Sequence, residues 1–225
     1  QAITPRHGKA VETNALWLEA LHIMADRARG TDNDAADHYS AEAERVGAAF
    51  ANAFWFGEGG YLYDCLTGDG PDASLRPNQV IALAQPHCPL SPAQQKQALD
   101  VVIHTLLTPM GLRTLAPSDG RYRHRYGGSW ESRDRAYHQG TVWPWLMGPM
   151  VQAYLRVHRF SDEARRQASV WLAPLDEHLL AAGLGTISEI CDGDPPHWPR
   201  GCIAQAWSVA EVLRAKRMVQ LGHLL

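Results

Sequence analysis

The stretch "HQGTVWPWLMGPMVQAYLRV", residues 138–157, decides the fold. It opens on polar residues, but between 141 and 157 the only polar side chains are those of Thr141, Gln152 and Arg156. A helix that is apolar on every side must be covered on every side. The stretch therefore predicts a helix that lies inside the molecule, with a polar phrase at the point where it begins.

Six further segments predict helices, and they fall into two kinds. Residues 11–25, 76–85 and 201–215 also begin with polar or small residues and continue as broadly apolar helices. Residues 36–57, 92–107 and 161–180 instead carry one apolar stripe with the spacing i, i+3, i+4, i+7, which is typical of a helix with a single buried face. Ser91-Pro92 and Ser161 provide the N-caps of the last two.

The two kinds of helix alternate along the chain, in the order inner, outer, inner, outer, inner, outer, inner. No segment shows the period-2 pattern of a strand, so we expect an all-α protein with concentric helical layers. Residues 57–75, 108–137 and 183–200 are expected to be long, packed loops, and connections of that length are usually functional. The polar phrases all precede inner helices, so they are expected to meet at one end of the inner ring and line a pocket.

Composition excludes several classes of protein. The 225 residues are 45% hydrophobic and 20% charged, with a formal net charge of −3, which gives no support for binding nucleic acid or a membrane surface. No apolar run is long enough to span a membrane. The four cysteines form no C-x-x-C pair and no zinc spacing with histidine, so we expect reduced thiols in a cytoplasmic protein without metal or cofactor.

Glu189 is the sharpest candidate for chemistry. It lies in the loop "GLGTISEICDGDPPHWPRGC", just before the last inner helix, where a carboxylate could act as a general base and activate a water molecule. A structural role, in which Glu189 caps a helix or pairs with Arg200, explains the same position. From these residues alone both roles remain open.

A second set of residues could bind a sugar. Aromatic rings suit the apolar faces of sugars, and paired Asp, Arg, Asn and Gln side chains suit vicinal hydroxyl groups. Each member also has a structural explanation, as a cap, a loop anchor or a core tryptophan. The candidates are Arg76, Asn78, Gln79, Arg133, Asp134, His138, Gln139, Trp143 and Trp145. The basic run "RYRHRYGGSWESRDR" (121–135) is interrupted by acidic residues, so we do not interpret it as a nucleic-acid patch.

Several phrases together resemble a known family. "TPRHGKAVETNALW", "RPNQVIAL", "GLRTLAP", "RDRAYHQGTVWPWLMGP" and "GTISEICDGDPPHWPRGCIAQAWSVAEVLR" occur in the order found in the C-terminal glucosidase domain of glycogen debranching enzymes. The resemblance covers nearly the whole chain. It implies an (α/α)6 toroid of six inner and six outer helices, of which residues 1–225 would form one C-terminal portion with about the last three and a half hairpins.

The resemblance also implies a reaction. The family hydrolyses α-1,6-linked glucose at the branch points of glycogen or limit dextrin with inversion, and its general base matches Glu189. The family's general acid is an Asp in a "W-x-R-D-T"-like phrase that this sequence lacks, so the acid and the rest of the toroid are expected upstream. Two alternatives remain: a related (α/α)6 glycosidase or phosphorylase, and a glucan-binding remnant without catalysis.

Overall fold

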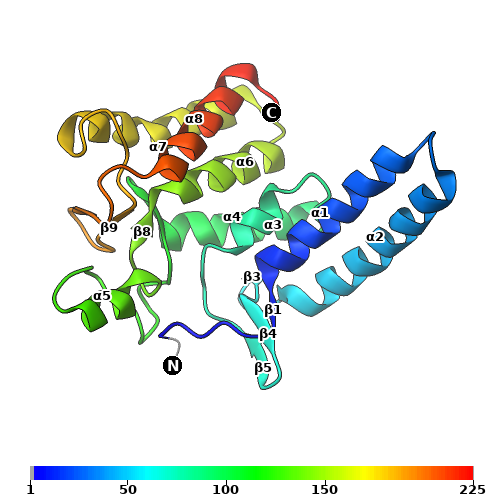
Figure 1. Ribbon diagram of the computed structural model, residues 1–225, viewed down its shortest axis with the longest axis horizontal. Helices are drawn as coiled ribbons and strands as arrows, with labels where there is room; N and C mark the ends of the chain where they lie inside the picture. Colours follow the sequence, from blue (N-terminus) through cyan, green and yellow to red (C-terminus); the bar gives the residue numbers. More distant parts are fainter. Residues whose placement is uncertain (1–2, 225) are drawn as a thin grey trace.

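The structure is a computed structural model that describes residues 3–224, and most of the chain is helical (Figure 1). The helices are α1 (Val11–Ala28), α2 (Asn33–Phe54), α3 (Gln79–Ala84), α4 (Pro92–Leu106), α5 (Trp130–Tyr137), α6 (Met147–Val157), α7 (Asp162–Ala181) and α8 (Ala206–Leu221). A 3-10 turn, η1 (Pro144–Leu146), precedes α6.

Four of these helices form an inner row. Helix α3 packs between α1 and α6, and α6 packs between α3 and α8, while α2, α4 and α7 cover the row from one side (Figure 1). Two side chains of α6 join it to α3. Arg156 donates to the carbonyl oxygen of Leu83 at 2.7 Å, and Gln152 donates to that of Ala84 at 2.8 Å. The predicted alternation of inner and outer helices is confirmed.

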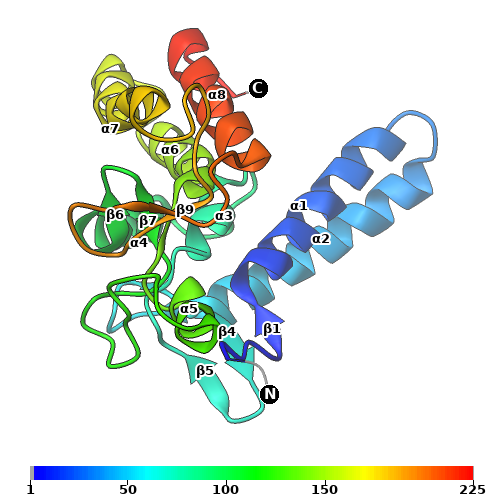
Figure 2. The ribbon, with the colours of Figure 1, turned by 60° about the vertical axis from the view of Figure 1, so that its left-hand side comes forward.

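The row is an arc with two uncovered ends. At one end, α1 exposes Leu16, Trp17, Ile23 and Met24, and at the other end α8 exposes Trp207 and Leu213. Figure 2 shows the α1–α2 hairpin projecting away from α6, α7 and α8. Helices α1 and α8 therefore lack a neighbour on one flank, and each buries only one face. The prediction that these two inner helices are covered on every side was wrong.

The predicted start signals act as helix caps. Ser91 and Gln94 form a capping box at the start of α4, with Pro92 in the first helical position. Ser161 accepts the backbone N–H of Ala164 at 3.3 Å and caps α7. These local bonds satisfy N–H groups that the first turn of a helix leaves free, which is why the boundaries agree with the sequence.

Short strands occupy much of the segments that were predicted to be loops. They form a hairpin of β2 (Trp55–Phe56) and β3 (Tyr61–Leu62), and an antiparallel sheet in the order β1 (Lys9–Ala10), β4 (Cys65–Thr67), β5 (Gly70–Asp72). A second antiparallel sheet has the order β10 (Pro199–Arg200), β9 (Ile190–Cys191), β8 (Val142–Trp143), β7 (Gly111–Arg113), β6 (Leu107–Thr108). Strands of two or three residues are too short to show an alternating pattern, so the sequence did not reveal them.

Several predicted boundaries were wrong, since α2 ends at Phe54, α3 begins at Gln79 and α8 spans Ala206–Leu221. Residues 138–143 are not helical, because Gly140 has a φ of 140° and Val142–Trp143 pairs as a strand before the turn at Pro144. Residues 130–137, predicted to be loop, form helix α5, whose N-cap Ser129 accepts the N–H of Ser132. Ala136 is the one buried residue of α5, so this helix has no apolar stripe by which to recognise it.

Within residues 3–224, no helix is both long and apolar enough to cross a membrane. In the same range no three His, Cys, Asp or Glu side chains gather as a metal site would require. Cys65, Cys88, Cys191 and Cys202 are all free thiols, and Cys202 is exposed.

Candidate active site

A cavity of about 260 Å³ lies where the polar phrases meet, and we call it the aromatic cavity. Its lining comes from the segments before α1, α3 and α6 and from the start of α8, as predicted from their order. The volume is near the lower end of the range of roughly 300–1,000 Å³ for small-molecule sites. The lining includes Arg6, Arg76, Asn78, Thr114, His138, Trp143, Trp145 and Trp207.

Aromatic rings form one wall of this cavity. The rings of His138 and Trp143 are nearly parallel, at 9°, with centroids 5.5 Å apart. Trp145 stacks on Trp207 with centroids 5.4 Å apart, and Trp207 remains 47% exposed. The indole N–H of Trp143 donates to the carbonyl oxygen of Tyr137 at 3.1 Å, so its ring is fixed in orientation. The wall therefore offers flat apolar faces of the kind that sugar rings stack against.

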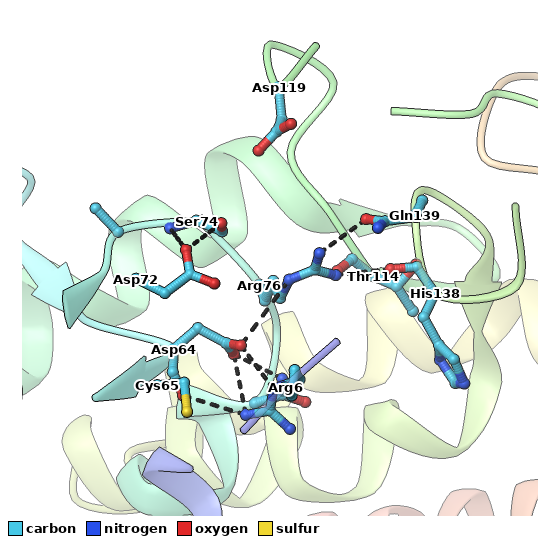
Figure 3. Close-up of polar contacts among 12 residues, drawn as sticks. Arg6, Asp64, Cys65, Asp72, Ser74, Arg76, Thr114, Asp119, His138 and Gln139 are labelled. Carbon is cyan, nitrogen blue, oxygen red and sulfur yellow. Dashed lines mark hydrogen bonds and ion pairs between the residues drawn. The ribbon is translucent and has the colours of Figure 1, made fainter. Parts of the chain in front are cut away.

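A buried carboxylate organises the polar side of the cavity (Figure 3). Asp64 precedes β4 and accepts hydrogen bonds from Arg6 Nε at 2.7 Å and from Asn78 Nδ2 at 2.7 Å. Burial raises the pKa of Asp64, whereas its neighbours, Arg6 first, lower it by less. The pairing of β1 with β4 brings residues 6 and 64 together, because Ala10 lies opposite Cys65.

Arg76 holds the backbone around the cavity. Its guanidinium donates to the carbonyl oxygens of Thr114 at 3.0 Å and His138 at 2.6 Å, and to Gln139 Oε1 at 2.7 Å (Figure 3). The remaining Nε–H lies 3.9 Å from Asp64 and has no hydrogen-bond partner among residues 3–224. Three of the five N–H donors of Arg76 are therefore occupied by protein.

Glu189 does not line the aromatic cavity but lies behind its aromatic wall, next to Tyr137. Its carboxylate accepts a short hydrogen bond from the hydroxyl of Tyr137 and the backbone N–H of Cys202 at 2.8 Å. The ring of Tyr137 contacts Trp143 edge-on, with centroids 4.9 Å apart. Burial, and then the bond to Glu189, raise the pKa of Tyr137, which keeps its hydroxyl protonated as a donor.

Strand pairing places Glu189 there. Glu189 directly precedes β9, and Cys191 in β9 pairs with Val142 in β8. This register brings the loop after α7 against the phrase before α6, although the two are about fifty residues apart in the chain. Gly201 lies so close that a methyl group at this position would overlap with the carboxylate of Glu189.

The structure does not bring every candidate to the aromatic cavity. Gln79 is buried and bonds to the backbone, accepting the N–H of Leu62 at 3.2 Å and donating to the carbonyl oxygen of Arg76. Arg133 and Asp134 lie on the exposed surface of α5 and do not line the aromatic cavity. Neither arrangement supports direct contact with a ligand in the aromatic cavity.

Sequence reasoning missed Arg6, Tyr137 and Trp207. All three lie inside the phrases quoted for the family resemblance, but nothing in those phrases indicated what the three side chains do. Arg6 precedes the first inner helix, and Tyr137 immediately precedes His138. The partners that define Arg6 and Tyr137, Asp64 and Glu189, are 58 and 52 residues away in the chain, and a local pattern contains no such information.

Solved structures of similar shape define the class of fold. The chain superimposes on a neutral trehalase (Nth1) from Saccharomyces cerevisiae with a TM-score of 0.67 and 14% identity, covering 93% of this chain and 39% of that one. A mannosylglycerate hydrolase of family GH63 from Thermus thermophilus gives a TM-score of 0.64 and 17% identity, covering 91% and 44%. The fold is that of the (α/α)6 toroid glycosidases, and the arc of hairpins described above is part of such a toroid.

Sequence comparison identifies the family. Residues 1–214 match the family described as amylo-alpha-1,6-glucosidase, and the chain belongs to that family. It is 30% identical to a glycogen debranching enzyme of Saccharomyces cerevisiae over 265 aligned positions, which cover 93% of this chain. The chain spans 17% of the length of that yeast protein. The resemblance inferred from the sequence phrases is confirmed.

Proposed function

We propose that residues 1–225 form the C-terminal portion of one glucosidase domain, which hydrolyses α-1,6-linked glucose at the branch points of glycogen or limit dextrin with inversion. The observation that carries this proposal is the position of Glu189, whose carboxylate is held by Tyr137 and the Cys202 N–H directly behind the aromatic wall. Membership of the amylo-alpha-1,6-glucosidase family supports the choice of linkage. The four free thiols fit the cytoplasm, where we place the protein.

In this proposal Glu189 is the general base. A carboxylate with both oxygens hydrogen-bonded is fixed in orientation, and each oxygen keeps a lone pair with which to take a proton from water. Inversion requires a second carboxyl group roughly 6.5–9.5 Å from the first to leave room for that water. Asn78, His138, Trp143 and Trp145 then bind the glucosyl unit, and Gln139 supports Arg76 from behind.

The general acid is assigned to a segment upstream of this chain. The lining of the aromatic cavity contains no carboxylate within residues 3–224. Asp64 is the nearest buried one, but Arg6 and Asn78 occupy its oxygens, and Asp134 lies on the far surface of α5. The same segment would supply helices to cover the open flanks of α1 and α8.

Replacing Glu189 tests the assignment. In the full-length parent protein, Glu189→Gln should reduce the kcat for glucose release from limit dextrin by about 10²–10⁴-fold, the usual contribution of a general base. Binding of the dextrin should change less than about twofold. Asp194→Asn is the matched control, because Asp194 is a loop carboxylate that also accepts a tyrosine hydroxyl, that of Tyr122 at 2.8 Å. An equal loss of binding and rate for Glu189→Gln would make Glu189 a binding or structural residue.

A second candidate function is glucan binding without hydrolysis, favoured by the absence of a carboxylate from the lining described within residues 3–224. The two functions differ in glucose release by this chain and by a form extended about 150–200 residues upstream, the size that a complete domain requires. Release by the extended form alone supports the proposed hydrolase with an upstream acid. Binding by both forms without release supports the second candidate.

A further inference from the structure

A second cavity of about 470 Å³ lies beside the aromatic cavity, and the proposed reaction does not use it. We call it the Trp130 hollow. It is lined by the first turn and one face of α5, by the arginine run that precedes α5, by Gln139 and by the segment before β1. The lining residues are Ile3, Arg121, Arg123, Trp130, Glu131, Arg135 and Gln139. Its volume lies within the range of roughly 300–1,000 Å³ for small-molecule sites.

The two cavities share a wall. Gln139 lines the Trp130 hollow and His138 lines the aromatic cavity. Arg76 donates to the side chain of Gln139 at 2.7 Å and to the backbone oxygen of His138 at 2.6 Å, so one guanidinium holds both linings. The backbone N–H of Arg123 donates to the carbonyl oxygen of Gln139 at 2.6 Å and fixes the arginine run to the same wall. The two linings are therefore joined through adjacent residues and shared hydrogen bonds.

Trp130 is the most exposed tryptophan of the chain for which burial is described, with 68% of its surface accessible. It is the first residue of α5, and the cap at Ser129 fixes the backbone on which it stands, with Ser129 Oγ accepting the Ser132 N–H at 3.2 Å. A large exposed ring on a fixed backbone, at the edge of a cavity, has little conformational freedom left to lose on binding and offers an apolar face. A buried or structural role does not account for this ring.

Two of the three arginines that line the hollow are paired with carboxylates, whereas Arg123 forms no ion pair within residues 3–224 and donates to the carbonyl oxygen of Tyr122 at 3.0 Å. Arg121 donates to Asp119 through Nε at 2.9 Å and Nη2 at 2.6 Å, and also to Ser74 Oγ at 2.6 Å. Arg135 donates to Glu131 at 2.7 Å. Pairs of this kind present fixed donors and acceptors side by side with little net charge, which suits vicinal hydroxyl groups more than an anion.

We propose that the Trp130 hollow is a glucan subsite, in which the ring of Trp130 stacks on the glucosyl units that follow the one in the aromatic cavity. The inference rests on the proposed function and deepens it, because it assigns the binding of the longer chain to residues outside the cavity where the bond is cleaved. Chain binding then depends on Trp130 and Arg135, neither of which contacts Glu189 or lines the aromatic cavity.

Retention of the protein in native gels that contain glycogen tests the subsite. Trp130→Ala and Arg135→Ala should each weaken retention by roughly tenfold, as the loss of a central aromatic or arginine contact does at other interfaces. Two matched controls should leave retention within about twofold: Trp17→Ala, which removes a 55% exposed tryptophan on α1, and Arg166→Ala, which breaks an exposed helical pair with Glu163 at 2.6 Å. Thermal unfolding of each variant shows that the fold is kept.

The outcomes separate the subsite from the proposed function. If Trp143→Ala abolishes retention and Trp130→Ala leaves it unchanged, the subsite is wrong and the proposed function stands. If the unaltered chain is not retained at all, the subsite is wrong, and the proposed function stands or falls on glucose release by the form extended upstream. A third outcome is that inorganic phosphate at millimolar concentration protects the chain against unfolding and that Arg123→Ala removes this protection. If Trp130→Ala also leaves retention unchanged, the hollow is an anion site and the glucan subsite is wrong.

Discussion

His178 should make the stability of the protein depend on pH in a way that reaches the candidate site. It lies in the last turn of α7, 4% exposed, and its Nε2 accepts the backbone N–H of Ser188 at 3.2 Å. The hydroxyl of Ser188 lies 3.1 Å from the same nitrogen. Ser188 immediately precedes Glu189, so this bond anchors the segment that carries the proposed base. Protonation of Nε2 would remove the acceptor.

Burial lowers the pKa of His178 below its ordinary value of 6.5. The unfolded chain therefore binds a proton at a pH where the folded chain does not, and stability falls as the pH decreases below 6.5. One such proton costs at most about 1.4 kcal/mol for each pH unit, so stability at pH ~5.5 should be lower than at pH ~7.5 on account of His178, by no more than that amount. Above pH 6.5 the contribution of His178 is fully present.

The assay is urea unfolding of the unaltered chain and of His178→Gln at about pH 7.5 and about pH 5.5. Glutamine offers an acceptor oxygen near the position of Nε2 and does not titrate, so the variant should lose less stability than the unaltered chain on acidification. His178→Ala leaves the Ser188 N–H buried and unpaired, and should be less stable at both pH values by about 1–3 kcal/mol. Equal losses for the unaltered chain and His178→Gln would refute the reasoning, because His178 would then take up its proton equally in both states.

Two further changes test the site and the fold. Tyr137→Phe keeps the ring against Trp143 but removes the hydroxyl that holds Glu189. In the full-length parent protein kcat should therefore fall by about tenfold, which corresponds to about 1.4 kcal/mol, with little change in KM. An unchanged kcat would show that the hydroxyl does not position the carboxylate. Gly111→Ala should destabilise the chain by about 3 kcal/mol or more in urea unfolding, because Gly111 has a φ of 140° and a methyl group there overlaps with the backbone oxygen of Trp143. Gly120→Ala, where the added methyl meets no atom within 4 Å, is the control and should change stability by less than about 0.5 kcal/mol.

The sequence by itself determined the alternating order of inner and outer helices. Whether a helix is covered on one side or on all sides decides how many of its faces can be apolar, and that property follows from the spacing of residues along one segment. The apolar run in 141–157 and the stripe in 92–107 therefore predicted an inner and an outer helix, and both were found. The same order predicted that the polar phrases before α1, α3 and α6 meet at one cavity.

The tertiary structure alone decided what each polar side chain does. Arg76 and Gln79 are both polar residues at the start of an inner helix, yet Arg76 lines the cavity while Gln79 bonds to the backbone behind it. Glu189 acquires its partner Tyr137 only through the pairing of β9 with β8. Apolar periodicity is a local property, because burial acts on each face of a helix separately. The use of a hydrogen-bond donor or acceptor depends on which groups reach it from distant parts of the chain, and only the folded structure brings them there.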